Sequence, residues 1–131
     1  MFSVGTLFGL WLTLPIGLPF LGQAWAEKVD FNRQIRPILS EHCFACHGLD
    51  EPQGGLRLDF AEFAYKGGKS GFPAIAPGDL KESEVLNRVV SMEEDDRMPP
   101  KGEPLKPEQV ELLRQWISSG AQYAKHWAYV V

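Results

Sequence analysis

The stretch Cys43-Phe44-Ala45-Cys46-His47 decides how the rest of this chain folds. It contains the only two cysteines of the 131 residues, and a histidine directly follows the second one. Cys-x-x-Cys-His is the pattern to which a c-type haem is attached. Two intervening residues let both thiols reach the vinyl groups at one edge of a porphyrin, and the next residue, His47, then supplies an axial ligand to the iron. We therefore expect one haem c, bound covalently by Cys43 and Cys46.

Three other interpretations use the same residues. A thioredoxin-like Cys-x-x-Cys needs a βαβ context, which this sequence does not suggest. A zinc site needs four ligands, and only His42 and His126 remain outside the motif. A structural disulfide is possible in an exported protein. Together these form the hypothesis of a thiol- or metal-based binding module without haem.

The second axial ligand has to come from elsewhere in the chain, and Met98 is the candidate. It lies in the segment 95–100, which Pro99 and Pro100 stiffen and keep out of a helix. A thioether on a rigid loop suits Met/His ligation of haem, which raises the reduction potential. The competing interpretation is that Met98 only fills an apolar gap. With His47 and Met98 as metal ligands no position is left for oxygen, which favours electron transfer over catalysis.

The other candidate ligands fit less well. Met92 stands at the end of a predicted helix and is the runner-up. His42 adjoins the motif and cannot reach across the ring, while His126 lies beyond the last predicted helix. We keep Met98 as the expected ligand.

The first 26 residues resemble an export signal. They contain no charged side chain, residues 7–14 form an apolar core, and Ala24-Trp25-Ala26 offers the small-x-small pattern for cleavage. An uncleaved membrane anchor is the alternative, although prolines and glycines interrupt residues 15–22. We predict a signal peptide over 1–26 and a location in the periplasm or on the outer face of the inner membrane. Contact with the membrane is expected only if this segment is retained.

Composition indicates one globular domain, with 44% hydrophobic and 23% charged residues. Thirteen Lys and Arg against seventeen Asp and Glu give a net charge of −4, which argues against a nucleic-acid partner. The predicted divisions are a cytochrome domain over 27–124 and a C-terminal extension over 125–131.

Periodicity predicts a mostly α fold of short helices, joined by long glycine- and proline-rich connections and organised around a ligand. The helices are expected near 33–46, 59–66, 83–90 and 107–119. Pro37 should lie in a first turn or kink the first helix. The second should begin with a capping box at Asp59-Phe60-Ala61-Glu62 and stop at Gly67-Gly68. In the last two, the apolar residues predicted to face inward or to flank the buried stripe are Val85, Leu86, Val89, Val90, Val110, Leu112, Leu113, Trp116 and Ile117.

Several stretches resemble the cytochrome c-like domain found in large planctomycete proteins. They are residues 31–39 leading into 43–48, and then 54–59, 67–71, 97–100 and 113–121. The resemblance covers nearly all of residues 29–130. It implies a class I cytochrome c fold in which the first and last helices cross with the haem between them, and it implies His47 and Met98 as the axial pair.

The resemblance also implies a larger context. In that family the domain usually opens a much longer chain, and His126-Trp127-Ala128-Tyr129 looks like the junction to further domains. We therefore expect 125–131 to be a truncated junction or a tail that packs on a partner. The expected partners are redox proteins or a C-terminal domain of the same full-length chain. The main hypothesis is an electron-transfer module that is not itself an enzyme. The alternative is a haem-bearing redox domain of a larger exported enzyme, hydrolase-like or oxidoreductase.

Within that fold we select further cofactor contacts. Arg57 is the candidate partner of a haem propionate, with Arg97 second. Phe60, Phe63 and Trp116 are candidates for the haem wall, although aromatic residues at such spacing belong first to the core.

Overall fold

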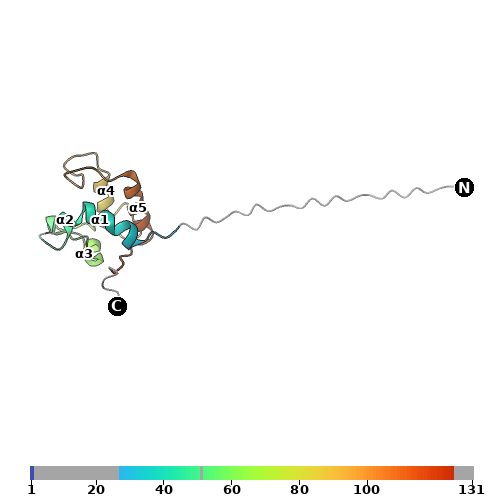
Figure 1. Cartoon of the computed structure of the whole chain (residues 1–131), viewed down its shortest axis with the longest axis horizontal. Helices are drawn as coiled ribbons and strands as arrows, with labels where there is room; N and C mark the ends of the chain where they lie inside the picture. Colours follow the sequence, from blue (N-terminus) through green and yellow to red (C-terminus); the bar gives the residue numbers. More distant parts are fainter. Residues whose placement is uncertain (2–26, 51, 126–131) are drawn as a thin grey trace.

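The structure is a computed structural model that describes residue 1 and residues 27–50 and 52–125. Its helices are short, and α2, α3, α4 and α5 are arranged around α1 (Figure 1). In chain order they are η1 (Phe31–Ile35, a π-helix), α1 (Arg36–His42), α2 (Phe44–His47), η2 (Gln53–Gly55, a 3₁₀ helix), α3 (Ala61–Lys66), α4 (Glu84–Val89) and α5 (Pro107–Ser118). The predicted signal peptide and most of the C-terminal extension lie outside the described residues.

The part of the chain that the structure describes has no β-strand apart from an isolated bridge between Ala76 and Asp79. The prediction of a mostly α fold with short helices is therefore confirmed. None of the helices described combines the length and the hydropathy that crossing a membrane requires.

The first predicted helix is divided into three pieces. Asp30 begins it, because its carboxylate accepts a hydrogen bond from the backbone N–H of Arg33 at 3.0 Å. Pro37 lies in the first turn of α1, as predicted, directly after the π-helical turn η1. Cys43 interrupts the helix at φ −125°, ψ −42°, and α2 continues beyond it. The expected continuous helix over 33–46 was therefore wrong at the haem-attachment motif.

The start of α3 also differs from the prediction. Its N-cap is Phe60, which makes no side-chain capping hydrogen bond. Asp59 does not close a capping box, because its carboxylate binds the Arg57 guanidinium at 3.0 and 2.7 Å. The predicted end is right, since Gly67 stops the helix at φ +82°.

Helices α4 and α5 agree with the predicted apolar pattern except at three positions. Val110 was expected in the buried stripe of α5 with Leu113 and Ile117, but it is only half-buried. Val90 was expected to face inward, but it follows the end of α4 and is 49% exposed. Trp116 was expected to flank the buried stripe of α5, and it is instead buried with Leu113 and Ile117. Pro107 opens α5 as predicted.

An aromatic cluster joins the two ends of the domain. The Phe31 ring lies 5.5 Å from Trp116 and 4.7 Å from Tyr123, measured between ring centroids. Tyr123 also contacts Trp116 at 5.1 Å and Tyr65 at 6.1 Å. Because aromatic pairs add to the free energy of burial, this cluster holds η1, α3 and α5 together. The first and last helical segments therefore meet, as the class I fold requires.

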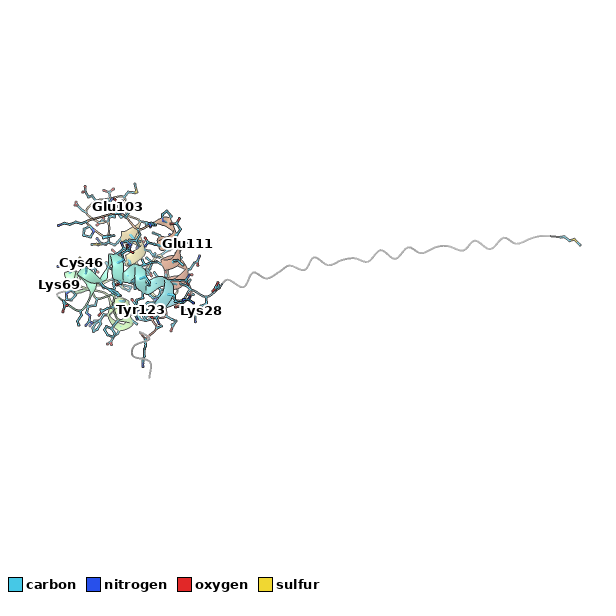
Figure 2. All side chains as sticks on the ribbon, viewed as in Figure 1. Lys28, Cys46, Lys69, Glu103, Glu111 and Tyr123 are labelled. Atoms are coloured by element: carbon cyan, nitrogen blue, oxygen red, sulfur yellow. The ribbon has the colours of Figure 1, made fainter. Side chains whose placement is uncertain are left out.

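The segment after α5 is tied back to the start of the chain. Asn32 donates a hydrogen bond to the carbonyl of Lys125 at 3.1 Å, and Arg36 donates one to the carbonyl of Ala124 at 2.9 Å. The Tyr123 hydroxyl donates to the carbonyl of Leu58 at 2.9 Å. The first two contacts close the domain near Lys28, on the side opposite to Cys46 (Figure 2).

Candidate haem site

A cavity of about 450 Å³ contains the predicted haem ligands. Its wall is formed by the end of α1, by α2, by the segment 53–74, by α4 and by residues 98–105. Cys43, Cys46, His47 and Met98 all line it, although Met98 is far from the motif in sequence. The volume falls in the range of about 300–1,000 Å³ that is usual for cofactor and small-molecule sites. The fold therefore brings the covalent anchor and both predicted axial ligands to one space.

The break at Cys43 sets the orientation of α2, the short turn that carries Cys46 and His47. The backbone N–H of His47 donates to the carbonyl of Cys43 at 2.8 Å, which forms the single turn of α2. The carbonyl of His47 in turn accepts a hydrogen bond from the N–H of Leu58 at 2.7 Å. These two bonds fix the backbone of His47 on both sides. Cys43 is buried, while Cys46 is exposed at the edge of the domain.

The His47 ring has an unsatisfied nitrogen. Among the described residues, His47 Nδ1 is the one buried side-chain nitrogen or oxygen without a hydrogen-bond partner. No protein group holds this nitrogen, so the His47 ring, which lines the cavity, is not committed to another side chain or carbonyl there. Imidazole and thioether side chains are axial ligands of haem iron in cytochromes c. The residues present therefore fit a haem c.

The Cys43 thiol fits a haem attachment better than it fits the redox chemistry of a thioredoxin-like motif. Burial, together with the nearby Cys46, raises the pKa of Cys43 to about 12. Disulfide exchange proceeds through a thiolate, and cysteines that are reactive in it have a lowered pKa, so Cys43 does not fit a thioredoxin-like redox motif. Over the described residues, no three His, Cys, Asp or Glu side chains come together as a metal cluster.

The segment that carries Met98 is held against α4. The Met98 N–H donates to the carbonyl of Arg88 at 3.1 Å, and Pro99 and Pro100 line the cavity beside it. The runner-up ligand, Met92, is 92% exposed and does not line the cavity. The geometry thus favours Met98 of the two methionines.

His42 lines the cavity but has a partner on α5. Its Nε2 lies 3.2 Å from Nε2 of Gln109, and Oε1 of Gln109 accepts a hydrogen bond from the N–H of Lys106 at 2.9 Å. Because the amide nitrogen of Gln109 can only donate, Nε2 of His42 is the acceptor. His42 therefore joins the end of α1 to the start of α5. His126 lies outside the described residues.

The structure places Arg57 outside this cavity. Its guanidinium is paired with Asp59 and lies over the Phe60 and Phe63 rings at 5.2 and 4.6 Å, and none of these four residues lines the cavity. The hydrogen bonds that Arg57 donates to the Asp59 carboxylate raise the pKa of Arg57. The role of Arg57 as a propionate partner stays a prediction, and this pairing does not favour it.

The other predicted wall residues are also elsewhere. Arg97 does not line the cavity, and Trp116 belongs to the aromatic cluster, as a core residue would. No residue of α5 lines the cavity, which lies between α2 and α4 and not between the first and last helices. The charged residues that do line it, Lys69, Glu84 and Arg88, were missed. The i,i+4 spacing of Glu84 and Arg88 was the available signal for two of them.

Comparison with known proteins agrees with this site. Residues 43–102 match the model of the family Planctomycete cytochrome C. Neither a curated protein nor a solved structure matches the chain. The match begins at the first cysteine of the motif and extends past Met98. Proteins of the cytochrome c family carry haem for electron transfer and usually function outside the cytoplasm. The chain therefore carries a planctomycete cytochrome C domain over residues 43–102.

Proposed function

We propose that this chain transfers single electrons through one haem c, bound covalently by Cys43 and Cys46, with His47 and Met98 as axial ligands. The observation that supports this proposal is the shared cavity, in which all four side chains meet. When bound, the haem supplies a one-electron couple between ferric and ferrous iron.

The chain's own residues account for the remaining requirements. The motif turn directs His47 into the cavity, and the two prolines after Met98 restrict the backbone that carries the thioether. Apolar side chains such as Leu56, Leu58 and Val89 cover part of the wall and limit the access of water. A thioether ligand and a dry wall both raise the reduction potential.

We further propose that the domain functions outside the cytoplasm, in the periplasm or on the outer membrane face, with redox proteins as partners. The exposed edge at Cys46 supports a route for electrons to such a partner. A larger exported enzyme that contains this domain would use the same edge.

The covalent haem is tested by a pyridine haemochrome spectrum of protein produced with the c-type maturation machinery. We expect the spectrum of a haem with both vinyl groups saturated. The Cys46→Ala variant should show the spectrum of a haem held by one thioether. A wild-type chain that carries no covalent haem under these conditions refutes the proposal.

The axial pair is tested by replacing each methionine in turn. Met98→Ala should give a ferrous haem that binds carbon monoxide, because one axial position is open. Met92→Ala is the matched control, since Met92 is 92% exposed and outside the cavity, and it should stay closed to carbon monoxide. Equal spectra and equal carbon monoxide binding in both variants overturn the assignment of Met98.

A further inference from the structure

Arg88 is the residue on α4 through which the segment bearing Met98 is held. Its carbonyl accepts the N–H of Met98 at 3.1 Å and the N–H of Ser91 at 3.3 Å. The chain between these two donors, from Ser91 to Met98, leaves α4, makes a turn at 93–97 and returns to the same carbonyl. The backbone of Arg88 thus forms the base of a closed loop that ends at Met98.

The Arg88 side chain braces the same loop from its other side. Its Nε donates to the Glu84 carboxylate one turn back on α4, at 3.0 Å. Its Nη1 donates to Oδ1 of Asp96 at 3.4 Å and to the Asp96 carbonyl at 3.5 Å. The guanidinium therefore links rigid helix to loop two residues before Met98.

The position of this link matters because the loop is otherwise exposed. Residues 92–96 are all exposed, and Asp96 keeps 63% of its side-chain surface in contact with solvent. Within the loop, the Arg97 N–H donates to the Glu93 carbonyl at 2.9 Å, and the Asp96 N–H to the same carbonyl at 3.2 Å. These bonds shape the turn but do not attach it to the domain. Attachment rests on Arg88.

We propose that Arg88 is a positioning residue for Met98, which holds the thioether in the cavity by fixing the loop to α4. This inference rests on the proposed axial role of Met98. The guanidinium makes a planar fork, so one side chain can bind Glu84 and Asp96 together, which a lysine ammonium matches less well. Loss of the brace should raise the fraction of molecules in which Met98 is away from the cavity, and external ligands would bind that fraction.

The experiment measures imidazole binding to the ferric, haem-loaded protein, together with the methionine-to-iron charge-transfer band. In Arg88→Ala we expect imidazole to bind about threefold to tenfold more tightly, the range that loss of a half-exposed, doubly paired ion allows. Arg88→Lys should recover part of the effect. Asp96→Asn changes the exposed partner of Arg88 and should increase the imidazole affinity by a smaller factor. The double variant Arg88→Ala/Asp96→Asn should bind imidazole no more tightly than Arg88→Ala alone, because both changes remove the same link.

A matched control separates this role from a general loss of ion pairing. Arg114 forms an i,i+3 pair with Glu111 on α5 at 3.8 Å and does not line the cavity. Arg114→Ala should leave the imidazole affinity and the band unchanged.

The possible failures are distinguishable. If Met98→Ala itself binds imidazole no more tightly than wild type, the axial assignment fails and the role of Arg88 fails with it. If Met98→Ala does bind more tightly while Arg88→Ala and Arg114→Ala both match wild type, only the positioning role is overturned. The positioning role is also overturned if Arg88→Ala and Arg114→Ala lower the urea midpoint equally and neither changes the imidazole affinity. A merely structural role of Arg88 would give that result.

Discussion

Preventing haem attachment should unfold this domain. The perturbation is the double variant Cys43→Ala/Cys46→Ala, compared with wild-type protein produced both with and without the maturation machinery. Without haem, the space of about 450 Å³ between α2 and α4 has no apolar filling. The side chains around it then lose the contacts that a packed interior supplies.

The magnitude follows from the cavity. At roughly 24 cal/mol for each Å³ of void, a dry space of 450 Å³ corresponds to about 11 kcal/mol. Water can enter from the open side, which lowers this figure, so we take about 5–11 kcal/mol as the range. Domains of this kind have a total stability of about 5–15 kcal/mol. The loss is therefore comparable to the whole free energy of unfolding.

The assay is urea unfolding followed by far- and near-UV circular dichroism. We expect a cooperative transition for the haem-loaded protein, and none for the double variant or for wild-type chain made without haem. The wild-type chain without haem controls for the cysteine substitutions. A haem-free chain that unfolds cooperatively at nearly the same urea concentration as the loaded protein would refute the reasoning, because the rest of the core would then be sufficient.

Three further predictions concern the loaded protein. Tyr123→Phe leaves the Leu58 carbonyl without its donor and should lower the free energy of unfolding by about 1–3 kcal/mol in urea titrations. Burial, with Tyr65 nearby, raises the pKa of Tyr123 in the folded protein, so above about pH 10 this tyrosine ionises first in the unfolded chain. The difference in free energy of unfolding between wild type and Tyr123→Phe should therefore shrink as the pH rises above about 10. A difference that stays constant to about pH 11 would contradict this. Gly67→Ala places a Cβ against the backbone carbonyl of Phe72 at positive φ and should lower the free energy of unfolding by about 3 kcal/mol or more. Gly71→Ala is also at positive φ but in open space, and should lower it by only about 1 kcal/mol. Equal thermal midpoints for the two variants would remove the steric argument. Arg57→Lys should leave the haem midpoint potential unchanged, and a clear shift in voltammetry would restore its role at a propionate.

Features that depend on local sequence were predictable. The bounds of α4 and α5 follow from apolar spacing and from Pro107, and both agree with the structure to within one or two residues. The prolines after Met98 identified the loop that reaches the cavity. In these cases the residues that determine the conformation are neighbours in the chain.

Features that depend on distant contacts were not predictable. The interruption of the first helix at Cys43 places a buried thiol in the cavity wall, and nothing in the helical spacing of 33–46 announces it. Asp59 had a choice between capping α3 and pairing with Arg57, and propensity alone favoured the cap. The link between Arg88 and Asp96 was not predictable, because Asp96 is brought back to α4 only by the turn at 93–97.

The closure of the chain ends by Asn32, Arg36 and Tyr123 has a practical consequence for attaching this domain to a surface. Lys28, which lies close to Asn32 and Ala124, is on one side of the molecule, whereas Cys46 and Lys69 lie on the other (Figure 2). A linker grafted after Lys125 would therefore anchor the domain to an electrode with the Cys46 edge turned toward the solution. Electrons exchanged directly with that electrode would have to cross the width of the protein, while a soluble partner would find the near edge free.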